Sequence, residues 1–169
     1  LVERAGDAIM ASAKGTRQSD VPWKPNVTVT VAAVVKRGDR FLLVEEKDDS
    51  AKVLNQPAGH VEAQEGIIAA VRREVLEETG WEFTPRALVG MYHWHNAGNA
   101  TTYLRFCFAG DVGNHDPDLP LDAGIIRALW LTRAEVEGQK DRLRSPMVLR
   151  CIQDFESGQS FPLHLLRQL

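Results

Sequence analysis

The sequence predicts a single α/β (α+β) domain in which a mixed β-sheet is flanked by helices, as an α/β/α sandwich. Three observations support this fold class. Segments rich in β-branched and apolar residues are interspersed with segments of helix-forming residues. The length of 169 residues is typical of one compact domain. No internal repeat or low-complexity tract divides the chain. Strands and helices mixed within one domain favour a sheet with helices on both faces.

The N-terminal segment differs in composition from the rest of the chain. It is mixed and partly polar, and Pro22 and Pro25 lie at the entry to the first expected strand. We therefore expect residues 1–24 to form a mobile N-terminal extension. Residues 25–169 are expected to form the folded domain.

Period-2 and β-branched segments predict the strands of the sheet. The expected strands cover residues 27–35, 41–46, 87–94, 101–110 and 125–131. Residues 36–39 are expected to form the turn of a hairpin. A polar loop follows the second strand, and the Pro and Gly of residues 55–59 predict irregular structure there. Residues 114–120 are expected to form a loop before the last strand.

The most regular helical pattern lies at residues 65–79, and Gly80 is suited to end this helix. Ile68, Val71 and Val75 form an apolar stripe that should pack on the sheet. Two shorter helices are expected at residues 133–137 and 146–157.

Composition and charge exclude several classes of protein. With 44% hydrophobic residues, 25% charged residues and a net charge of −3, the chain is unlike a general nucleic-acid binder. The longest apolar run, Val27–Val35, is too short to cross a bilayer, and the chain does not open with a signal-peptide pattern. Cys107 and Cys151 are expected to be reduced thiols. We therefore expect a cytoplasmic protein without a membrane or a stable nucleic-acid partner.

Three acidic residues share one face of the principal predicted helix. Glu74, Glu77 and Glu78 stand at positions i, i+3 and i+4. Their carboxylates repel one another, and a hard divalent cation with oxygen ligands removes that cost. A solvated acidic face is the alternative, and Arg73 can pair with Glu77 at i,i+4.

The spacing around these acids resembles the Nudix box. The matched positions are Gly59, Glu65, Arg73, Glu74, Val75, Glu77, Glu78 and Gly80. Ordinary residue frequencies would produce this match on the order of once in 10⁹ windows. The one departure is Trp81, at a position where the family prefers an aliphatic residue and where packing is expected.

The resemblance implies a Nudix-type α/β/α sandwich and a role for each matched residue. Gly59, through its backbone carbonyl, and Glu74, Glu77 and Glu78 would bind the metal, with Mg²⁺ as the expected cofactor and Mn²⁺ as a substitute. Arg73 would anchor the preceding loop to the helix through carboxylates such as Glu77 or Glu65.

Further segments resemble the bacterial NudJ-type phosphatase branch of the family. They are residues 25–29, 55–62, 104–106, 143–146 and 157–159, so the likeness extends from about Lys24 to Leu166. This branch implies removal of a terminal phosphate from nucleoside di- and triphosphates or from thiamine-related pyrophosphates.

The expected reaction needs a water aligned with phosphorus and a base that takes its proton. The catalytic group is expected to comprise Glu74, Glu77, Arg73 and Asp122. Glu74 and Asp122 are the candidate bases. For Asp122, an ordinary acid of a surface loop is the alternative.

Five further residues are candidates for substrate binding: His60, Glu62, Trp94, Tyr103 and Arg105. His60 and Arg105 would contact phosphate, and Glu62 would contact metal or substrate. The two aromatic residues would stack on a base or pyrimidine ring. Each has a structural alternative: a solvent-facing loop, electrostatics at the helix N-terminus, packing, or an outward position on a strand.

Two other functions remain open from the sequence. The same box serves nucleotide-sugar and ADP-ribose pyrophosphatases, which yield two monophosphates. A non-catalytic Nudix ligand sensor is disfavoured because all box carboxylates are present. A small nucleotide or pyrophosphate substrate is the expected partner, and the sequence does not indicate an oligomeric state.

Overall fold

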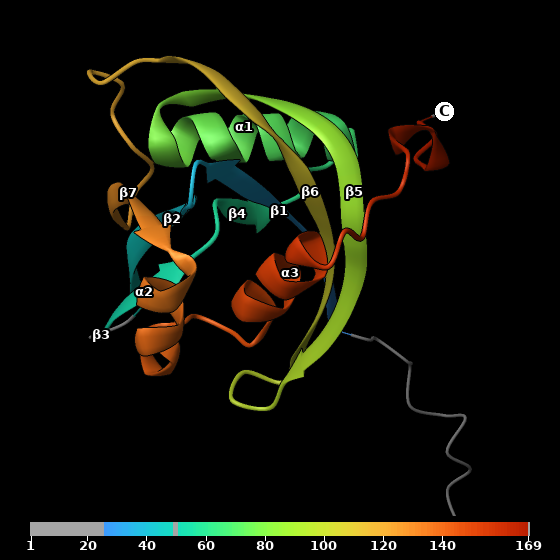
Figure 1. Ribbon diagram of the computed structural model, residues 1–169. Helices are drawn as coiled ribbons and strands as arrows, with labels where there is room; N and C mark the ends of the chain where they lie inside the picture. Colours follow the sequence, from blue (N-terminus) through green and yellow to red (C-terminus); the bar gives the residue numbers. More distant parts are fainter. Residues whose placement is uncertain (1–25, 49–50, 169) are drawn as a thin grey trace, which may run out of the picture.

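The computed structural model describes residues 26–48 and 51–168. The predicted extension at residues 1–24 lies outside the described residues. Seven strands and three α-helices are described (Figure 1). The strands are β1 (Val27–Arg37), β2 (Arg40–Asp48), β3 (Ala51–Asn55), β4 (Ala58–His60), β5 (Trp81–Asn96), β6 (Thr101–His115) and β7 (Ile125–Thr132). The helices are α1 (Ile67–Thr79), α2 (Arg133–Gly138) and α3 (Met147–Glu156), with short 3₁₀ turns at Lys140–Arg142 and Leu163–Leu165.

The sheet is mixed, as predicted. Its main strand order is β3-β2-β1-β6-β5, with β4 paired to β1 and β7 paired to β2. The central β1 and β6 are parallel, whereas the other named pairs are antiparallel. In the β1–β6 register, Thr30 lies opposite Arg105.

Helices cover both faces of this sheet, which confirms the predicted sandwich (Figure 1). Alternate residues of β1 project to opposite sides. Val31, Ala33 and Val35 join the core under α1, together with Val71 and Val75 of that helix. Ala32 and Val34 join the core on the other face, which includes residues of α2 and α3. Each face therefore has its own apolar cluster.

Helix α1 carries the predicted apolar stripe but begins later than expected. Val71 and Val75 are fully buried, which confirms their predicted packing. Gly80 adopts a left-handed conformation with φ 71° and ends the helix, as glycine does without steric cost. The prediction that the helix starts at Glu65 is wrong: it starts at Ile67, because Gly66 is extended and Arg73 holds the Glu65 side chain outside the helix.

The sheet extends into four segments where the sequence predicted no strand. Strand β3 occupies the expected polar loop, and Ala58 and Gly59 belong to β4 although irregular structure was predicted for residues 55–59. Strand β5 begins at Trp81, and shifts of register around Pro85 accommodate the proline at the edge of the sheet. The predicted loop at 114–120 begins later, because β6 continues to His115.

Trp81, the departure from the box, packs as expected. Its ring stacks on His115 with centroids 4.3 Å apart, and the Arg37 guanidinium lies 4.5 Å from the ring centroid. The same guanidinium lies 4.9 Å from Trp130. A bulkier residue therefore fills this position through aromatic and cation–π contacts.

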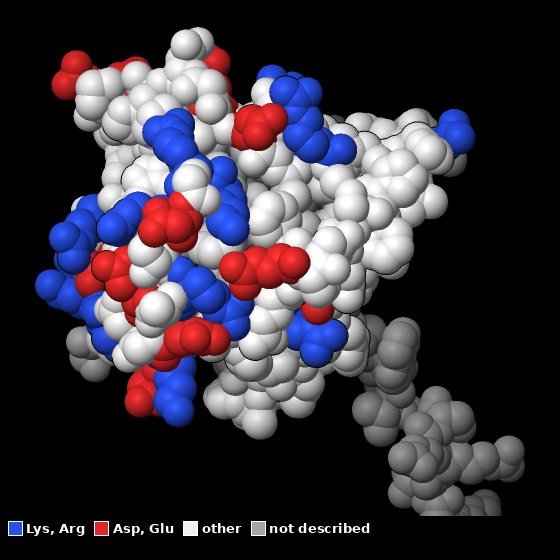
Figure 2. Space-filling view, in the orientation of Figure 1, with Lys and Arg blue, Asp and Glu red and all other residues white. Residues whose placement is uncertain are grey.

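The surface carries both signs of charge. On the face drawn in Figure 2, basic and acidic side chains intermix on the side of β2, β7 and α2, while the area over β5 and the C-terminal segment is largely uncharged. Among the described residues, no helix combines the length and apolar character needed to cross a bilayer.

Candidate active site

Every residue predicted for the site lines one cavity of about 630 Å³. Its lining includes Gly59, His60, Glu62, Arg73, Glu74, Glu77, Glu78, Trp94, Tyr103, Arg105 and Asp122. The volume is within the usual range for small-molecule sites, roughly 300–1,000 Å³. Residues spread over some 60 positions of the chain thus meet in one place.

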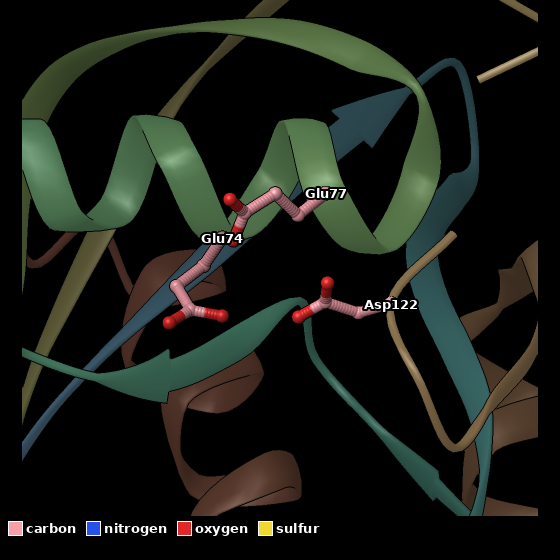
Figure 3. A group of neighbouring side chains, drawn as sticks. All are labelled: Glu74, Glu77 and Asp122. Atoms are coloured by element: carbon pink, nitrogen blue, oxygen red, sulfur yellow. The ribbon is translucent and has the colours of Figure 1, made fainter. Parts of the chain in front are cut away.

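Three carboxylates converge at one end of the cavity. Glu74 and Glu77 extend from α1 and Asp122 from the loop before β7, with their carboxylates turned toward one another (Figure 3). One oxygen of each lies within 4.8 Å of the others. Burial is the main cause that raises the pKa of Glu74, and the Arg73 charge opposes it.

The backbone holds the Asp122 loop against α1. The N–H of Asp122 donates to the carbonyl of Glu77 at 3.0 Å, and the N–H of Ile125 donates to the carbonyl of Asp122 at 3.0 Å. Gly124, with φ 97°, allows the chain to turn directly into β7. An exposed loop acid is thereby placed beside two helix acids.

Gly59 is needed where the loop approaches the helix. A Cβ atom at this position would overlap the Glu74 carboxylate. Gly59 pairs with Val31 in the β4–β1 register, so the adjacent sheet restrains its position. The absence of a side chain therefore permits the close approach of the loop to the acidic cluster.

Arg73 ties the loop to the acidic helix, as expected. Its guanidinium donates to Glu65 at 2.8 Å, Glu74 at 2.7 Å and Glu77 at 3.0 Å. It also donates to the backbone carbonyl of His60 at 3.0 Å. These bonds raise the pKa of Arg73, and the Arg73 hydrogen bonds are the largest cause that lowers the pKa of Glu65.

Glu78 has a different environment from the other two helix acids. It is buried, and its Oε2 accepts a hydrogen bond from the N–H of Ala58 at 2.9 Å. Burial raises the pKa of Glu78 to about 9. It lines the cavity but lies outside the cluster of Glu74, Glu77 and Asp122. Its role as a metal ligand stays a prediction.

The predicted aromatic pair forms one wall of the cavity. Trp94 and Tyr103 are partners in the β5–β6 register, and their rings stack with centroids 5.6 Å apart at 23°. The Tyr103 hydroxyl accepts a hydrogen bond from Asn99 at 3.0 Å. His60 and Glu62 are exposed at the loop that leads to α1. Their predicted contacts with substrate stay predictions.

The structure also brings polar residues into the cavity that the sequence did not single out. Thr30, Asn55 and Ser145 are buried beside Arg105, and Glu46 lies among them, half-buried. Asn55 and Ser145 fall in segments that resemble the NudJ-type branch, but neither has a spacing that indicates a role. Thr30 has the pattern of an ordinary strand residue. The parallel pairing that places it beside Arg105 is long-range and has no local signal.

The donor set at the acidic end fits a divalent cation. Three carboxylates offer oxygen ligands within 4.8 Å of one another, and the Gly59 loop approaches them closely. Mg²⁺ prefers such oxygen ligands and retains several waters, so a set of two or three protein ligands is sufficient. Glu74 and Glu77 would hold the cation from adjacent turns of α1.

Comparison with known proteins gives consistent results. A family model described as NUDIX domain matches residues 25–151. The chain is 40% identical over 144 residues to the protein named Phosphatase NudJ of Escherichia coli (strain K12), covering 85% of this chain and 92% of that protein. The corresponding protein of Shigella flexneri gives the same identity and coverage.

Solved structures show the same relationship. A NUDIX hydrolase from Nitrosomonas europaea superposes with a TM-score of 0.83 and 50% identity, covering 86% of this chain and 98% of that one. The MutT protein from Methanosarcina mazei Go1 superposes with a TM-score of 0.64 at 22% identity, covering 82% and 100% of the two chains. The second similarity concerns the fold alone.

Proposed function

This chain belongs to the Nudix family of hydrolases that act on phosphoanhydride bonds, and we propose that it releases orthophosphate from nucleoside di- and triphosphates or thiamine-related pyrophosphates. The observation that carries the proposal is the cluster of Glu74, Glu77 and Asp122 within a cavity that has room beyond the diphosphate. Similarity to a protein named a phosphatase supports terminal rather than internal cleavage.

Mg²⁺ is the proposed cofactor, with Mn²⁺ as a substitute. Glu74, Glu77 and the Gly59 carbonyl would hold it, with Glu78 as a further predicted ligand. When bound, the cation neutralises phosphate charge and makes water a stronger acid. Arg73 keeps Glu74 and Glu77 oriented through its hydrogen bonds.

We propose Asp122 as the base that takes the proton of the attacking water. Arg73 donates to Glu74 at 2.7 Å, whereas the exposed Asp122 carboxylate accepts no hydrogen bond from the described residues, and only the Asp122 backbone N–H is bonded, to the Glu77 carbonyl. Its oxygen lies within 4.8 Å of both helix acids, beside the position where a phosphate would meet the cation. Glu74 was the other candidate, and it is assigned here to binding the metal.

The substrate contacts complete the proposal. Arg105 and His60 would donate to phosphate or ring acceptors, Glu62 would contact the metal or its waters, and Trp94 and Tyr103 would stack on a ring. We also propose a cytoplasmic location, as expected from the sequence. The free thiols of Cys107 and Cys151 are compatible with a reducing compartment.

The test is a product assay on a panel of diphosphates with Mg²⁺. Glu77→Gln should lower kcat/KM by at least about 100-fold and weaken metal binding, since even residues that only support metal ligands matter by 10–100-fold. Glu82→Gln makes the same chemical change on β5, outside the cavity, and should behave as the parent protein.

The variant Asp122→Asn separates the two proposed roles. It should lower kcat much more than it lowers metal affinity, whereas Glu77→Gln should lower both. Orthophosphate as product supports the proposal. Two monophosphates would assign the enzyme to the nucleotide-sugar or ADP-ribose type, and metal binding without turnover of any compound would favour a ligand sensor.

A further inference from the structure

The cavity has a second polar region, separate from the acidic cluster. Four buried residues along it have side-chain atoms without a hydrogen-bond partner in the described structure: Thr30 Oγ1, Asn55 Oδ1, Arg105 Nε and Nη1, and Ser145 Oγ. Each of these residues is at most 6% exposed. Most buried polar groups in native proteins are paired, so four unpaired residues in one cavity need a ligand or water to complete them.

Strand alternation places this region on the face of the sheet opposite α1. Thr30 and Ala32 are two residues apart on β1, and Arg105 and Cys107 are two residues apart on β6, so the members of each pair project to the same face of the sheet. Ala32 and Cys107 belong to the core that packs on α3. Ser145 lies two residues before that helix. The cavity thus extends from the carboxylates of α1, past β4, to the α3 side of the sheet.

Arg105 is the one charged residue among these four. Its guanidinium is buried, and no carboxylate among the described residues lies within ion-pair distance of it. Burial is the largest cause of the shift and lowers the pKa of Arg105. A buried cation that lacks a partner is costly, and a ligand with acceptor atoms would remove part of that cost.

The mixture of donors and acceptors indicates the kind of ligand. Arg105 and the two hydroxyls can donate, but the unpaired Asn55 oxygen accepts. The Glu46 carboxylate lies beside the Asn55 side chain, with Arg144 Nε 3.5 Å from its Oε1. A phosphate group is mostly ionised at neutral pH and offers chiefly acceptors, so it would pair poorly with the Asn55 oxygen and face Glu46. A nitrogen heterocycle offers ring nitrogens or carbonyl oxygens together with amino or ring N–H groups. The stacked pair of Trp94 and Tyr103 on the same cavity suits a planar ring.

We propose that Thr30, Asn55, Arg105 and Ser145 form a subsite that binds the nitrogen heterocycle attached to the diphosphate. The proposal rests on the proposed function, because it assumes that the acidic cluster holds the diphosphate. It assigns substrate selection to residues outside the Nudix box. The box handles the group that is common to all substrates, and the subsite distinguishes what is attached to it.

The unpaired atoms allow a test that separates ligand binding from a structural role. Removal of such a group does not cost a hydrogen bond to another group of the described protein. Ser145→Ala and Thr30→Val should therefore retain or raise the Tm of the free protein. Ser157→Ala is the matched control, because the Ser157 hydroxyl donates to the carbonyl of Asp154 at 2.8 Å outside the cavity. It should lower the Tm without affecting substrate selection.

The activity measurement compares CDP, which carries a heterocycle, with inorganic tripolyphosphate, which does not. Ser145→Ala and Thr30→Val should each lower the ratio of kcat/KM for CDP over tripolyphosphate by about 3–10-fold, and Arg105→Met by about 100-fold, because sites that hydrogen-bond a substrate group discriminate strongly when pairing fails. An equal fall for both compounds would overturn the proposal and assign the subsite to phosphate. An unchanged ratio would also overturn it.

A binding measurement makes the result independent of turnover. Calorimetry with CMP in EDTA should show weaker binding to Arg105→Met and Ser145→Ala than to the parent protein and Ser157→Ala. If the parent protein hydrolyses neither compound, the product panel described above decides the proposed function, and the calorimetry alone decides whether the subsite exists. Equal CMP affinity in all four proteins, or no CMP binding to the parent protein, would refute the subsite.

Discussion

Replacement of Arg73 should destabilise the metal-free protein more than replacement of a comparable arginine elsewhere. Arg73 donates to three carboxylates and one carbonyl, and its side chain is 23% exposed. Hydrogen bonds to charged groups contribute about 1.5–3 kcal/mol each where they are buried, but exposed ion pairs contribute less than about 1 kcal/mol. Glu65 and Glu74 are 15% and 8% exposed, whereas Glu77 is 39% exposed.

The expected cost of Arg73→Met is therefore about 3 kcal/mol, most of it from the bonds to Glu65 and Glu74. For a protein of this size that cost corresponds to a Tm lower by about 6–12 °C. Arg73→Lys keeps the charge but loses the planar guanidinium that donates to several acceptors at once, so its loss of unfolding free energy should be intermediate.

The assay is urea unfolding in EDTA, where bound metal cannot mask the effect. Arg133→Met is the control: Arg133 is 22% exposed, but its partners Glu137 and Glu156 are 55% and 34% exposed. This control should lose about 1 kcal/mol. Equal losses for Arg73→Met and Arg133→Met would refute the reasoning, as would parental stability in Arg73→Lys.

Two further predictions concern neighbouring residues. The pKa of Glu78, raised to about 9 from 4.5, means that the metal-free fold is stabilised at low pH and loses stability as the pH rises from 4.5 towards 9. Glu78→Gln should thus be more stable than the parent protein at pH 8 and similar at pH 4.5, as measured by urea unfolding in EDTA; a less stable variant at pH 8 would contradict this. Gly59→Ala should destabilise by about 1–3 kcal/mol because its Cβ overlaps Glu74, whereas Gly138→Ala, with open space around it, should change stability by less than about 0.5 kcal/mol. Equal unfolding midpoints for these two alanine variants would contradict this prediction, because they would show that the loop at Gly59 moves away from Glu74 without loss of stability.

The local part of the site was predictable from the sequence. Helical periodicity places Glu74 and Glu77 on one face, and the box spacing adds Gly59 and Arg73 to the same neighbourhood. Each of these residues lies within 18 positions of the others, so short-range geometry is sufficient. Asp122 was found as a candidate only through its place before a strand, and its hydrogen bond to Glu77 explains its position.

The polar region beside α3 was not predictable in the same way. Arg105 was singled out, but its neighbours Thr30 and Ser145 reach it through a parallel strand pair and through the chain before α3. Such contacts depend on long-range topology, which leaves no spacing in the sequence. For the same reason β3 and β4 were missed: their pairing with β2 and β1, rather than residue preference, makes them strands.

The central parallel pair also has a consequence for how the protein folds. Strands β1 and β6 come together only after most of the intervening chain, including α1, has been placed, because parallel neighbours require a crossover. Pairings of such high sequence separation are slow to form. The helix that carries Glu74 and Glu77 depends on local contacts and can form early, whereas Thr30 and Arg105 become neighbours only when β1 meets β6. In refolding, the acidic end of the cavity should therefore precede the opposite end, and a chain arrested before this pairing would have the acids of α1 without the pocket that accompanies them.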